Sequence, residues 1–294
     1  MRKFLSGNEA FAEGVRLARP QVISAYPITP QTTVVEALAS MVEDGSLACE
    51  YLHVESEHTA LSAAIGASAT GARTFTATSS QGLLYMAECL TYASGGRFPI
   101  VMMNANRALA LPWNIYGDQR DSLSLLDHGW IQVYAENNQE AYDNFLQAMP
   151  IGEHPSVRLP VMICQDGFIT SHALENIVLL DTDSVKAFVG EYRPEHFLLK
   201  AENPLAIGPY DLGCHYMEHK VQQAEAMKNA KRAVLEVAAD FARTFGRKYG
   251  LFEAYAMEDA EVALVLIGST AGTAKACVQR LRERGVKAGL LKLR

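Results

Sequence analysis

The stretch Tyr26-Pro27-Ile28-Thr29-Pro30 follows directly on the apolar run Gln21-Val22-Ile23-Ser24-Ala25. An apolar run that ends in two prolines predicts a buried strand that stops in a rigid turn, because each proline fixes its own φ and biases the residue before it toward extended backbone. This turn would hold the Thr29 hydroxyl at the carboxyl end of a strand, where open α/β sheets bind ligands. The alternative is a proline-stiffened connection without chemistry, and the segment alone leaves both open.

Apolar runs alternate with helical patterns around this turn. Such alternation implies parallel strand pairing, and therefore a layered α/β fold. The helix predicted at 57–69 is rich in small residues on nearly every face, so we expect another backbone to approach it closely, in the core or at a subunit interface. The predicted strands are 21–26, 51–55, 73–78, 99–104, 131–135 and 160–164, and the predicted helices are 8–18, 32–43, 57–69, 82–93 and 138–148.

The pattern changes in the last third of the chain. Residues 181–215 are dotted with prolines and predict an irregular connection over the surface. A long helix is predicted at 216–245, where apolar residues recur at intervals of three and four. A new α/β unit then begins, with strands at 262–267 and 287–293 on either side of a helix at 273–284.

These segments predict the domain organisation. We expect one α/β domain at 1–190, a connection with the long helix at 191–258, and the start of a second α/β domain at 259–294. Two strands and one helix cannot bury a core alone, because stable sheets need more strands or a covering layer. The second domain is therefore expected to be incomplete within this chain.

Composition excludes several classes of protein. The chain has 294 residues, is 49% hydrophobic and carries a net charge of −7. Because phosphate recognition needs a clustered positive face, this balance argues against nucleic-acid binding. No uninterrupted apolar run of about 18 residues predicts a membrane span, and Met1–Gly7 lacks the apolar core of a secretory signal. Five scattered cysteines without a Cys-x-x-Cys pair disfavour a zinc or iron–sulfur site in this chain and favour a cytoplasmic protein.

Two carboxylates lie at the junction between the strand 51–55 and the helix 57–69. Glu57 opens the helix, where it could act chemically or only complement the helix dipole. Glu55 comes two residues earlier and could share a strand face with Glu57. The residues alone leave both the role and the choice between the two open.

Arg107 follows the most apolar predicted strand, 99–104. An arginine at the carboxyl end of a strand could clamp a substrate carboxylate through two parallel hydrogen bonds. The alternative is a surface ion pair with Asp118 or Asp121. The segment Gly268-Ser269-Thr270-Ala271-Gly272 is a weak signal for a phosphate cradle and is more typical of a tight turn.

Four ordered motifs resemble the α subunit of 2-oxoacid:ferredoxin oxidoreductases, and the pyruvate branch of that family is the nearest pattern. The resemblance covers about residues 6–294 and implies a domain that covers the aminopyrimidine ring of thiamine diphosphate, followed by a second α/β domain. It also implies that family members continue well past residue 294. The motifs are Tyr26–Pro30, Glu55-Ser56-Glu57-His58, Asn104-Ala105-Asn106-Arg107-Ala108-Leu109 and Gly117-Asp118-Gln119-Arg120-Asp121.

The resemblance also implies roles for individual residues. Glu57 would hydrogen-bond the pyrimidine nitrogen opposite the amine, which helps the cofactor to lose the thiazolium C2 proton. Thr29 and Arg107 would bind the 2-oxoacid carboxylate, and Pro27 and Ile28 would line the cofactor. The oxalate-using relative has arginine in place of Thr29, and the 2-oxoglutarate branch lacks the Asn-Arg-Ala-Leu pattern. Pyruvate is therefore the first expectation and a branched-chain 2-oxoacid such as 2-oxoisovalerate the second.

The chain lacks the Gly-Asp-Gly motif that anchors the diphosphate through magnesium in thiamine enzymes. We therefore expect a shared site, with no metal in this chain and with magnesium in a β subunit. Iron–sulfur clusters are expected in a ferredoxin-like subunit, and a γ subunit is expected in the same complex. The implied reaction converts pyruvate, coenzyme A and oxidised ferredoxin to acetyl-CoA, CO2 and reduced ferredoxin, or the reverse. A non-catalytic scaffold subunit is the alternative of a different class.

Overall fold

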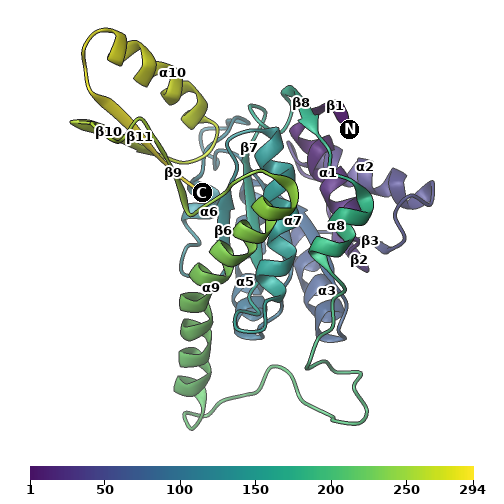
Figure 1. Ribbon diagram of the computed structural model, residues 1–294. Helices are drawn as coiled ribbons and strands as arrows, with labels where there is room; N and C mark the ends of the chain where they lie inside the picture. The colour runs from purple at the N-terminus through teal and green to yellow at the C-terminus, as the bar shows by residue number, and fades with distance from the viewer.

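The computed structural model describes residues 1–294 and has a six-stranded parallel sheet at its centre (Figure 1). The order of the strands is β3-β2-β4-β5-β7-β6, so the chain winds outward from the middle of the sheet in both directions. All six strands that the sequence predicts for the first α/β domain are present, with bounds that differ by a few residues. They are β2 (Val22–Ala25), β3 (Glu50–His53), β4 (Thr74–Thr78), β5 (Val101–Asn106), β6 (Ile131–Tyr134) and β7 (Val161–Asp166).

Helices cover both faces of this sheet. Alternate residues of β5 point to opposite faces: Val101 and Met103 pack with α1 and α7, whereas Met102 packs with α3 and α5. Burial on both faces explains why the strands read as continuous apolar runs. The helices of this layered unit are α1 (Gly7–Ala18), α2 (Thr32–Glu43), α3 (Glu57–Ala69), α4 (Ser80–Tyr85), α5 (Ala87–Gly95), α6 (Arg120–Leu123) and α7 (Asn138–Glu153).

Two predictions about helices are wrong. The single helix predicted at 82–93 is broken into α4 and α5, because Met86 leaves helical geometry with φ −93° and ψ 9°. The connection predicted to be irregular at 181–215 begins with helix α8 (Thr182–Val189), which Asp181 caps by accepting a hydrogen bond from the Ser184 amide. The rest of that connection carries no further helix or strand.

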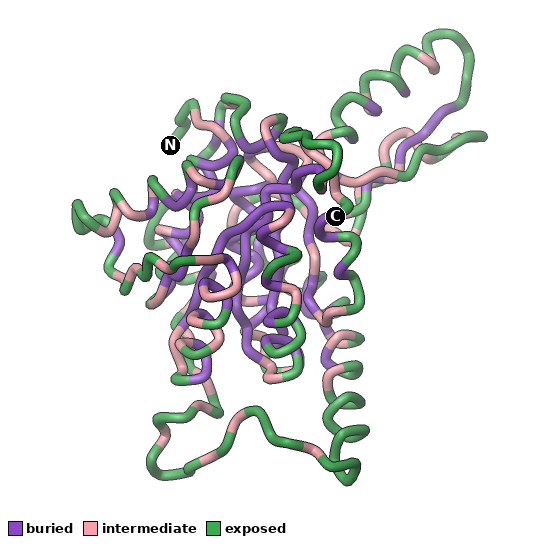
Figure 2. The backbone as a smooth tube through the Cα atoms, turned by 180° about the vertical axis from the view of Figure 1, so that it is seen from behind, coloured by how far each residue is buried: buried purple, intermediate pink, exposed green.

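The long helix α9 (Tyr216–Phe245) is confirmed with the predicted bounds. Its second half packs one apolar side against the main body through Ala230, Val237 and Phe241, whereas its first half is largely exposed (Figure 2). None of the helices combines the length and the apolarity that a membrane span requires.

Two antiparallel pairings escape sequence reasoning. Strand β1 (Arg2–Ser6) pairs with β8 (Leu174–Val178) at the edge of the main body. Strand β9 (Phe252–Tyr255) joins β10 (Val262–Leu266) and β11 (Ala288–Leu293) in a second sheet of order β10-β11-β9.

Helix α10 (Thr270–Glu283) packs on one face of this second sheet, and the pair projects beyond the main body (Figure 1). Val262 and Val265 on the edge strand β10 are 57% and 58% exposed. The division into 1–190, 191–258 and 259–294 stays a prediction, although β9 lies before residue 259 and pairs with the unit that follows it.

Charged side chains join the second sheet to the main body. Lys292 on β11 contacts Glu136 at 3.1 Å and Glu253 at 3.3 Å and donates a short hydrogen bond to Glu140, while Lys275 on α10 donates to Glu136 at 2.8 Å. The Lys292 side chain is almost fully buried. Because buried charges are tolerated only when paired, these contacts fix the second sheet beside the carboxyl end of β6.

Candidate functional site

The site is built where the parallel strands β2, β4 and β5 end. Arg107 directly follows β5 and is only 6% exposed. Its Nη1 donates to the carbonyl oxygen of Thr29 at 2.6 Å, and its Nη2 donates to Oε1 of Gln81 at 2.8 Å. Nε of Arg107 is buried without a hydrogen-bond partner. The guanidinium is therefore held between two turns and keeps an unused donor.

The alternative of a surface ion pair for Arg107 is wrong. Asp118 pairs with the exposed Arg120 at 2.6 Å. Asp121 is fully buried and accepts from the backbone N–H of Arg107, not from its side chain. Burial lowers the pKa of Arg107, while the charges of Asp121 and Glu57 oppose that shift, so two carboxylates lie close to the guanidinium without neutralising it by direct contact.

Glu57 is the first residue of α3 and is 9% exposed. Its carboxylate packs against α4 at Gly82: a Cβ at that position would lie 2.7 Å from both Oε1 of Glu57 and Oγ1 of Thr78. The Thr78 hydroxyl is itself buried and has no hydrogen-bond partner. A glycine is therefore required for the carboxylate to lie where it does.

The structure separates Glu55 from Glu57. Strand β3 ends at His53, so the two carboxylates share no strand face, and that expectation is wrong. Glu55 is exposed and accepts a hydrogen bond from the Thr59 hydroxyl at 2.7 Å, which lowers its pKa. Ser56 caps the helix between them. Glu57 is the one carboxylate of the pair that lies beside Arg107.

The turn 26–30 lies at the carboxyl end of β2 as expected, with Pro27 and Thr29 exposed and Ile28 half-buried. Two buried amides hold it. Asn8 donates to the carbonyl oxygen of Pro30 at 2.8 Å, and Gln31 donates to those of Tyr26 and Ala77 at 3.0 and 2.8 Å. Sequence reasoning missed Asn8, because an asparagine in the first turn of a helix is also an ordinary capping residue.

Gln81 was missed as well. It belongs to Ser79-Ser80-Gln81-Gly82, which carries no recognised motif, and only the fold brings its Oε1 to Arg107. The site residues predicted from the sequence thus come together at one place: Arg107 bonds the Thr29 backbone directly, and Gln81 and Gly82 connect it to Glu57.

The turn at 268–272 is not a phosphate cradle in this structure. The amide and the hydroxyl of Ser269 donate to Oδ2 of Asp166 at 2.7 and 2.5 Å. Gln119 donates to Oδ1 of the same carboxylate at 2.5 Å. The turn therefore docks the second sheet onto the carboxyl end of β7.

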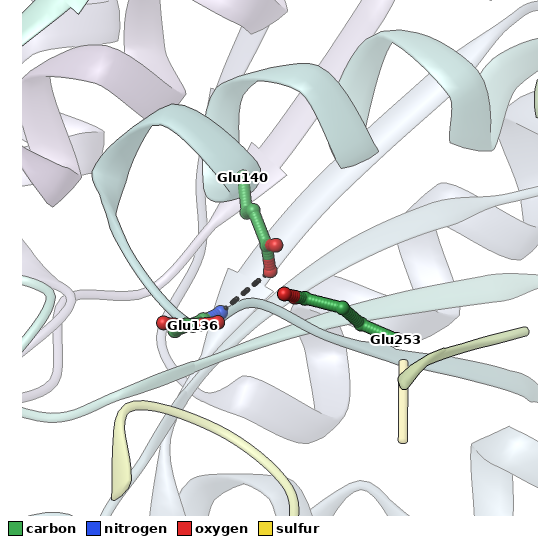
Figure 3. Close-up of side chains that lie close together, drawn as sticks. All are labelled: Glu136, Glu140 and Glu253. Atoms are coloured by element: carbon green, nitrogen blue, oxygen red, sulfur yellow. Dashed lines mark hydrogen bonds between the residues drawn. The ribbon is translucent and has the colours of Figure 1, made fainter. Parts of the chain in front are cut away.

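Three carboxylates elsewhere lie close enough to hold a cation: Glu136, Glu140 and Glu253, whose oxygen atoms lie within 4.8 Å of one another (Figure 3). The ammonium groups of Lys275 and Lys292 already contact these oxygens. Their charges raise the pKa of both lysines against the opposing effect of burial. The cluster is therefore satisfied as an ion-pair network.

Several large apolar side chains are exposed on segments that carry or follow residues of the site. The loop after Arg107 leaves Leu111, Trp113 and Tyr116 exposed, with Trp113 at 71%. Tyr85 on α4 and Leu126 after α6 are exposed too. Exposed apolar side chains gathered in one patch are typical of protein interfaces.

Comparison with protein families gives two matches in chain order. Residues 13–239 match the family described as "Pyruvate flavodoxin/ferredoxin oxidoreductase, thiamine diP-bdg". Residues 260–294 match "Pyruvate:ferredoxin oxidoreductase core domain II". The first match contains Thr29, Glu57 and Arg107, and the second contains β10, α10 and β11.

Curated relatives are similar over nearly the whole chain. "Pyruvate synthase subunit PorA" of Methanocaldococcus jannaschii is 50% identical over 294 residues, which cover 99% of this chain and 76% of the relative. The protein of the same name from Thermotoga maritima is 50% identical over 292 residues, 99% of this chain and 74% of the relative. "Ketoisovalerate oxidoreductase subunit VorA" of Pyrococcus horikoshii is 45% identical over 295 residues, 100% of this chain and 74% of the relative.

A solved structure shares the fold. The 2-oxoglutarate:ferredoxin oxidoreductase of Magnetococcus marinus superposes with a TM-score of 0.78 at 20% sequence identity. The match covers 99% of this chain, which spans about half (53%) of the length of that chain. Together with the two family matches, these similarities show that the chain belongs to the pyruvate flavodoxin/ferredoxin oxidoreductase family.

Proposed function

We propose that this chain is the α-type subunit of a pyruvate:ferredoxin oxidoreductase. It supplies the residues that bind the pyrimidine ring of thiamine diphosphate and the arginine clamp that binds the substrate carboxylate. The observation that carries the proposal is the convergence of Glu57, Arg107 and the Thr29 turn, which follow β3, β5 and β2, at the carboxyl edge of one parallel sheet. Residues from α3, β5 and the turn after β2 form one site, whereas a scaffold would not require a buried carboxylate and a buried guanidinium side by side.

The donor set fits the cofactor. Glu57 offers a carboxylate with space created by Gly82 beside it, and the Thr78 hydroxyl nearby is buried and unpaired. When bound, thiamine diphosphate supplies the carbanion chemistry that cleaves the bond next to a 2-oxoacid carbonyl. Glu57 would accept the hydrogen bond of the ring nitrogen and hold the tautomer that moves a proton, and Pro27 and Ile28 would pack on the ring.

Arg107 would orient the substrate. A guanidinium fixed by Thr29 and Gln81 is pre-organised for a carboxylate and loses little entropy when the substrate arrives. Burial strengthens each of its hydrogen bonds relative to those in water. The Thr29 hydroxyl, which is exposed on the same turn, would add one neutral donor.

Pyruvate is the proposed substrate, because two relatives at 50% identity carry the name pyruvate synthase. A branched-chain 2-oxoacid is the second candidate, since a relative at 45% is named for ketoisovalerate. In the proposed reaction pyruvate, coenzyme A and oxidised ferredoxin give acetyl-CoA, CO2 and reduced ferredoxin, or the reverse.

The remaining parts of the complex are proposed for other chains. The exposed apolar side chains of Leu111, Trp113, Tyr116, Tyr85 and Leu126 would pack against a β subunit that holds the diphosphate and magnesium. A ferredoxin-like subunit would hold the iron–sulfur clusters, and a γ subunit would complete the assembly. The cytoplasm is the proposed location, because its reducing conditions would keep the five free cysteines as thiols.

Steady-state kinetics of Arg107→Ala in the assembled complex test this function, with pyruvate and 2-oxoisovalerate as substrates. Removal of a charged hydrogen bond at a desolvated site costs about 2–5 kcal/mol, so kcat/KM for the preferred 2-oxoacid should fall well over tenfold. Thr29→Ala removes a neutral donor and should cost about 1 kcal/mol. Arg120→Ala, which removes an exposed arginine of the same region, is the matched control.

Unchanged pyruvate kinetics of Arg107→Ala together with weakened subunit association would make Arg107 an interface residue. A preference for 2-oxoisovalerate over pyruvate in the wild-type complex would select the second candidate.

A further inference from the structure

Asp121, on the short helix α6, lies at the centre of a buried hydrogen-bond network. Its side chain is fully buried, and both carboxylate oxygens accept hydrogen bonds only from N–H groups. No lysine or arginine side chain contacts it. The five donors are Asn106 Nδ2 and the Ser122 amide to Oδ1, at 2.8 Å each, and Asn104 Nδ2, the Ser80 amide and the Arg107 amide to Oδ2, at 3.1, 3.1 and 3.3 Å.

Two of these donors connect Asp121 to the Arg107 guanidinium from opposite sides. The Arg107 amide fixes the backbone from which the guanidinium extends. The Ser80 amide fixes the turn that carries Gln81, whose Oε1 receives Nη2 of Arg107. Ser80 has φ +49°, a left-handed conformation that a non-glycine residue keeps only when its surroundings impose it. One carboxylate thus holds both the base and the tip of the arginine side chain.

The five N–H donors around residue 121 also determine which side chain can occupy that position. An ionised carboxylate accepts at both oxygens, whereas an asparagine would turn an NH2 group toward at least two N–H donors. Buried donors that lose their acceptor cost more than an average hydrogen bond contributes. Burial raises the pKa of Asp121, and the hydrogen bonds from Asn106, Asn104, Ser122 and Ser80 oppose that rise.

We propose that Asp121 is a positioning residue for substrate binding: it holds Arg107 and Gln81 in the arrangement that presents the guanidinium to the 2-oxoacid carboxylate. The inference rests on the proposed role of Arg107 and deepens it. Asp121 touches neither substrate nor cofactor and acts through Arg107 alone. Its carboxylate also places a negative charge behind the guanidinium, which partly offsets the cost of burying that cation.

A double-mutant cycle in the assembled complex tests this role, with Asp121→Asn, Arg107→Ala and the double variant. The expected loss for Asp121→Asn is about 10- to 100-fold in kcat/KM for pyruvate, with the affinity for thiamine diphosphate unchanged. The double variant should be no slower than Arg107→Ala, because Asp121 has nothing left to position. Asp118→Asn, at a half-buried aspartate three residues earlier that pairs with the exposed Arg120, is the control and should keep wild-type kinetics.

A smaller perturbation covers the case in which Asp121→Asn does not assemble. Asn104→Leu keeps the Asp121 carboxylate and removes one of its five hydrogen-bond donors. It should lower kcat/KM for pyruvate about threefold to tenfold through Arg107. In the Arg107→Ala background the same substitution should cause no further loss.

Additive losses in either double variant would overturn the positioning role, because they would mean a general structural effect. Wild-type kinetics for Asp121→Asn with a large loss for Arg107→Ala would overturn it as well and leave the proposed function standing. Wild-type pyruvate kinetics for Arg107→Ala would instead refute the proposed clamp itself.

Discussion

Gly82 offers a perturbation that separates the site from the stability of the fold. Gly82→Ala would place a Cβ 2.7 Å from Oε1 of Glu57 and from Oγ1 of Thr78. Ordinary contacts begin at 3.4 Å, so the carboxylate must retreat by about 0.7 Å, and a misplacement of about 1 Å at a reacting group can cost about a hundredfold in rate. Gly82 lies in helix α4 with a normal φ, where alanine is favoured over glycine by up to about 1 kcal/mol.

We therefore expect Gly82→Ala to lower kcat for pyruvate-dependent ferredoxin reduction on the order of a hundredfold, while assembly and thermal stability change little. Gly66→Ala on α3 is the matched control, because nothing lies within 4 Å of the added Cβ, and it should keep full activity. Near wild-type kcat for Gly82→Ala would refute the reasoning that the Glu57 carboxylate works from this position.

Three further outcomes are expected. Lys292→Met removes a buried ammonium partner from Glu136 and Glu140, whose side chains are only 9% and 13% exposed, and should lower the free energy of unfolding by about 3 kcal/mol in denaturant titration. Lys287→Met at an exposed pair should change it by less than about 0.5 kcal/mol. Burial opposes ionisation of Glu253, but Lys275 and Lys292 outweigh it and lower the pKa of this carboxyl. Its ion pairs therefore stabilise the fold above pH 4.5 and are lost as the pH falls through the lowered pKa. In acid titration Glu253→Gln should lose less stability than wild type over that pH range. By calorimetry the chain alone should bind thiamine diphosphate weakly, and tight magnesium-dependent binding would contradict a shared site.

The central sheet could be predicted because its signals are local. The inner strands β5 and β7 are buried on both faces and begin as continuous apolar runs, and turn residues mark the limits of several strands. The long helix α9 could be predicted as well, since its buried positions recur at helical spacing over 216–245.

The strands that were missed depend on distant partners. Strand β1 pairs with β8 across most of the chain, and β9 pairs with β11 over more than thirty residues, so neither short segment carries its own signal.

The same contrast holds for the site. Thr29 and Arg107 stood out because they follow predicted strands, where ligands bind in such sheets, whereas the choice of Glu57 over Glu55 came from the family resemblance. Gln81, Asp121 and Asn8 could not be named in either way, because each acts through a hydrogen bond to a residue that is far away in the sequence. Residues that position a site are polar and buried, and sequence alone gives no measure of which polar residues are buried.

The most direct test of the account compares Glu57→Gln with Glu55→Gln in the assembled complex. Glutamine keeps the volume at residue 57 but replaces the ionisable carboxyl, which would share a proton with the pyrimidine nitrogen, by a neutral amide that cannot exchange one. General acid–base contributions of this kind amount to about a hundredfold or more. We predict that Glu57→Gln assembles and loses most of its pyruvate turnover, whereas Glu55→Gln, whose side chain faces solvent and Thr59, stays close to wild type. Near wild-type turnover of Glu57→Gln, with the loss at Glu55→Gln instead, would contradict the account.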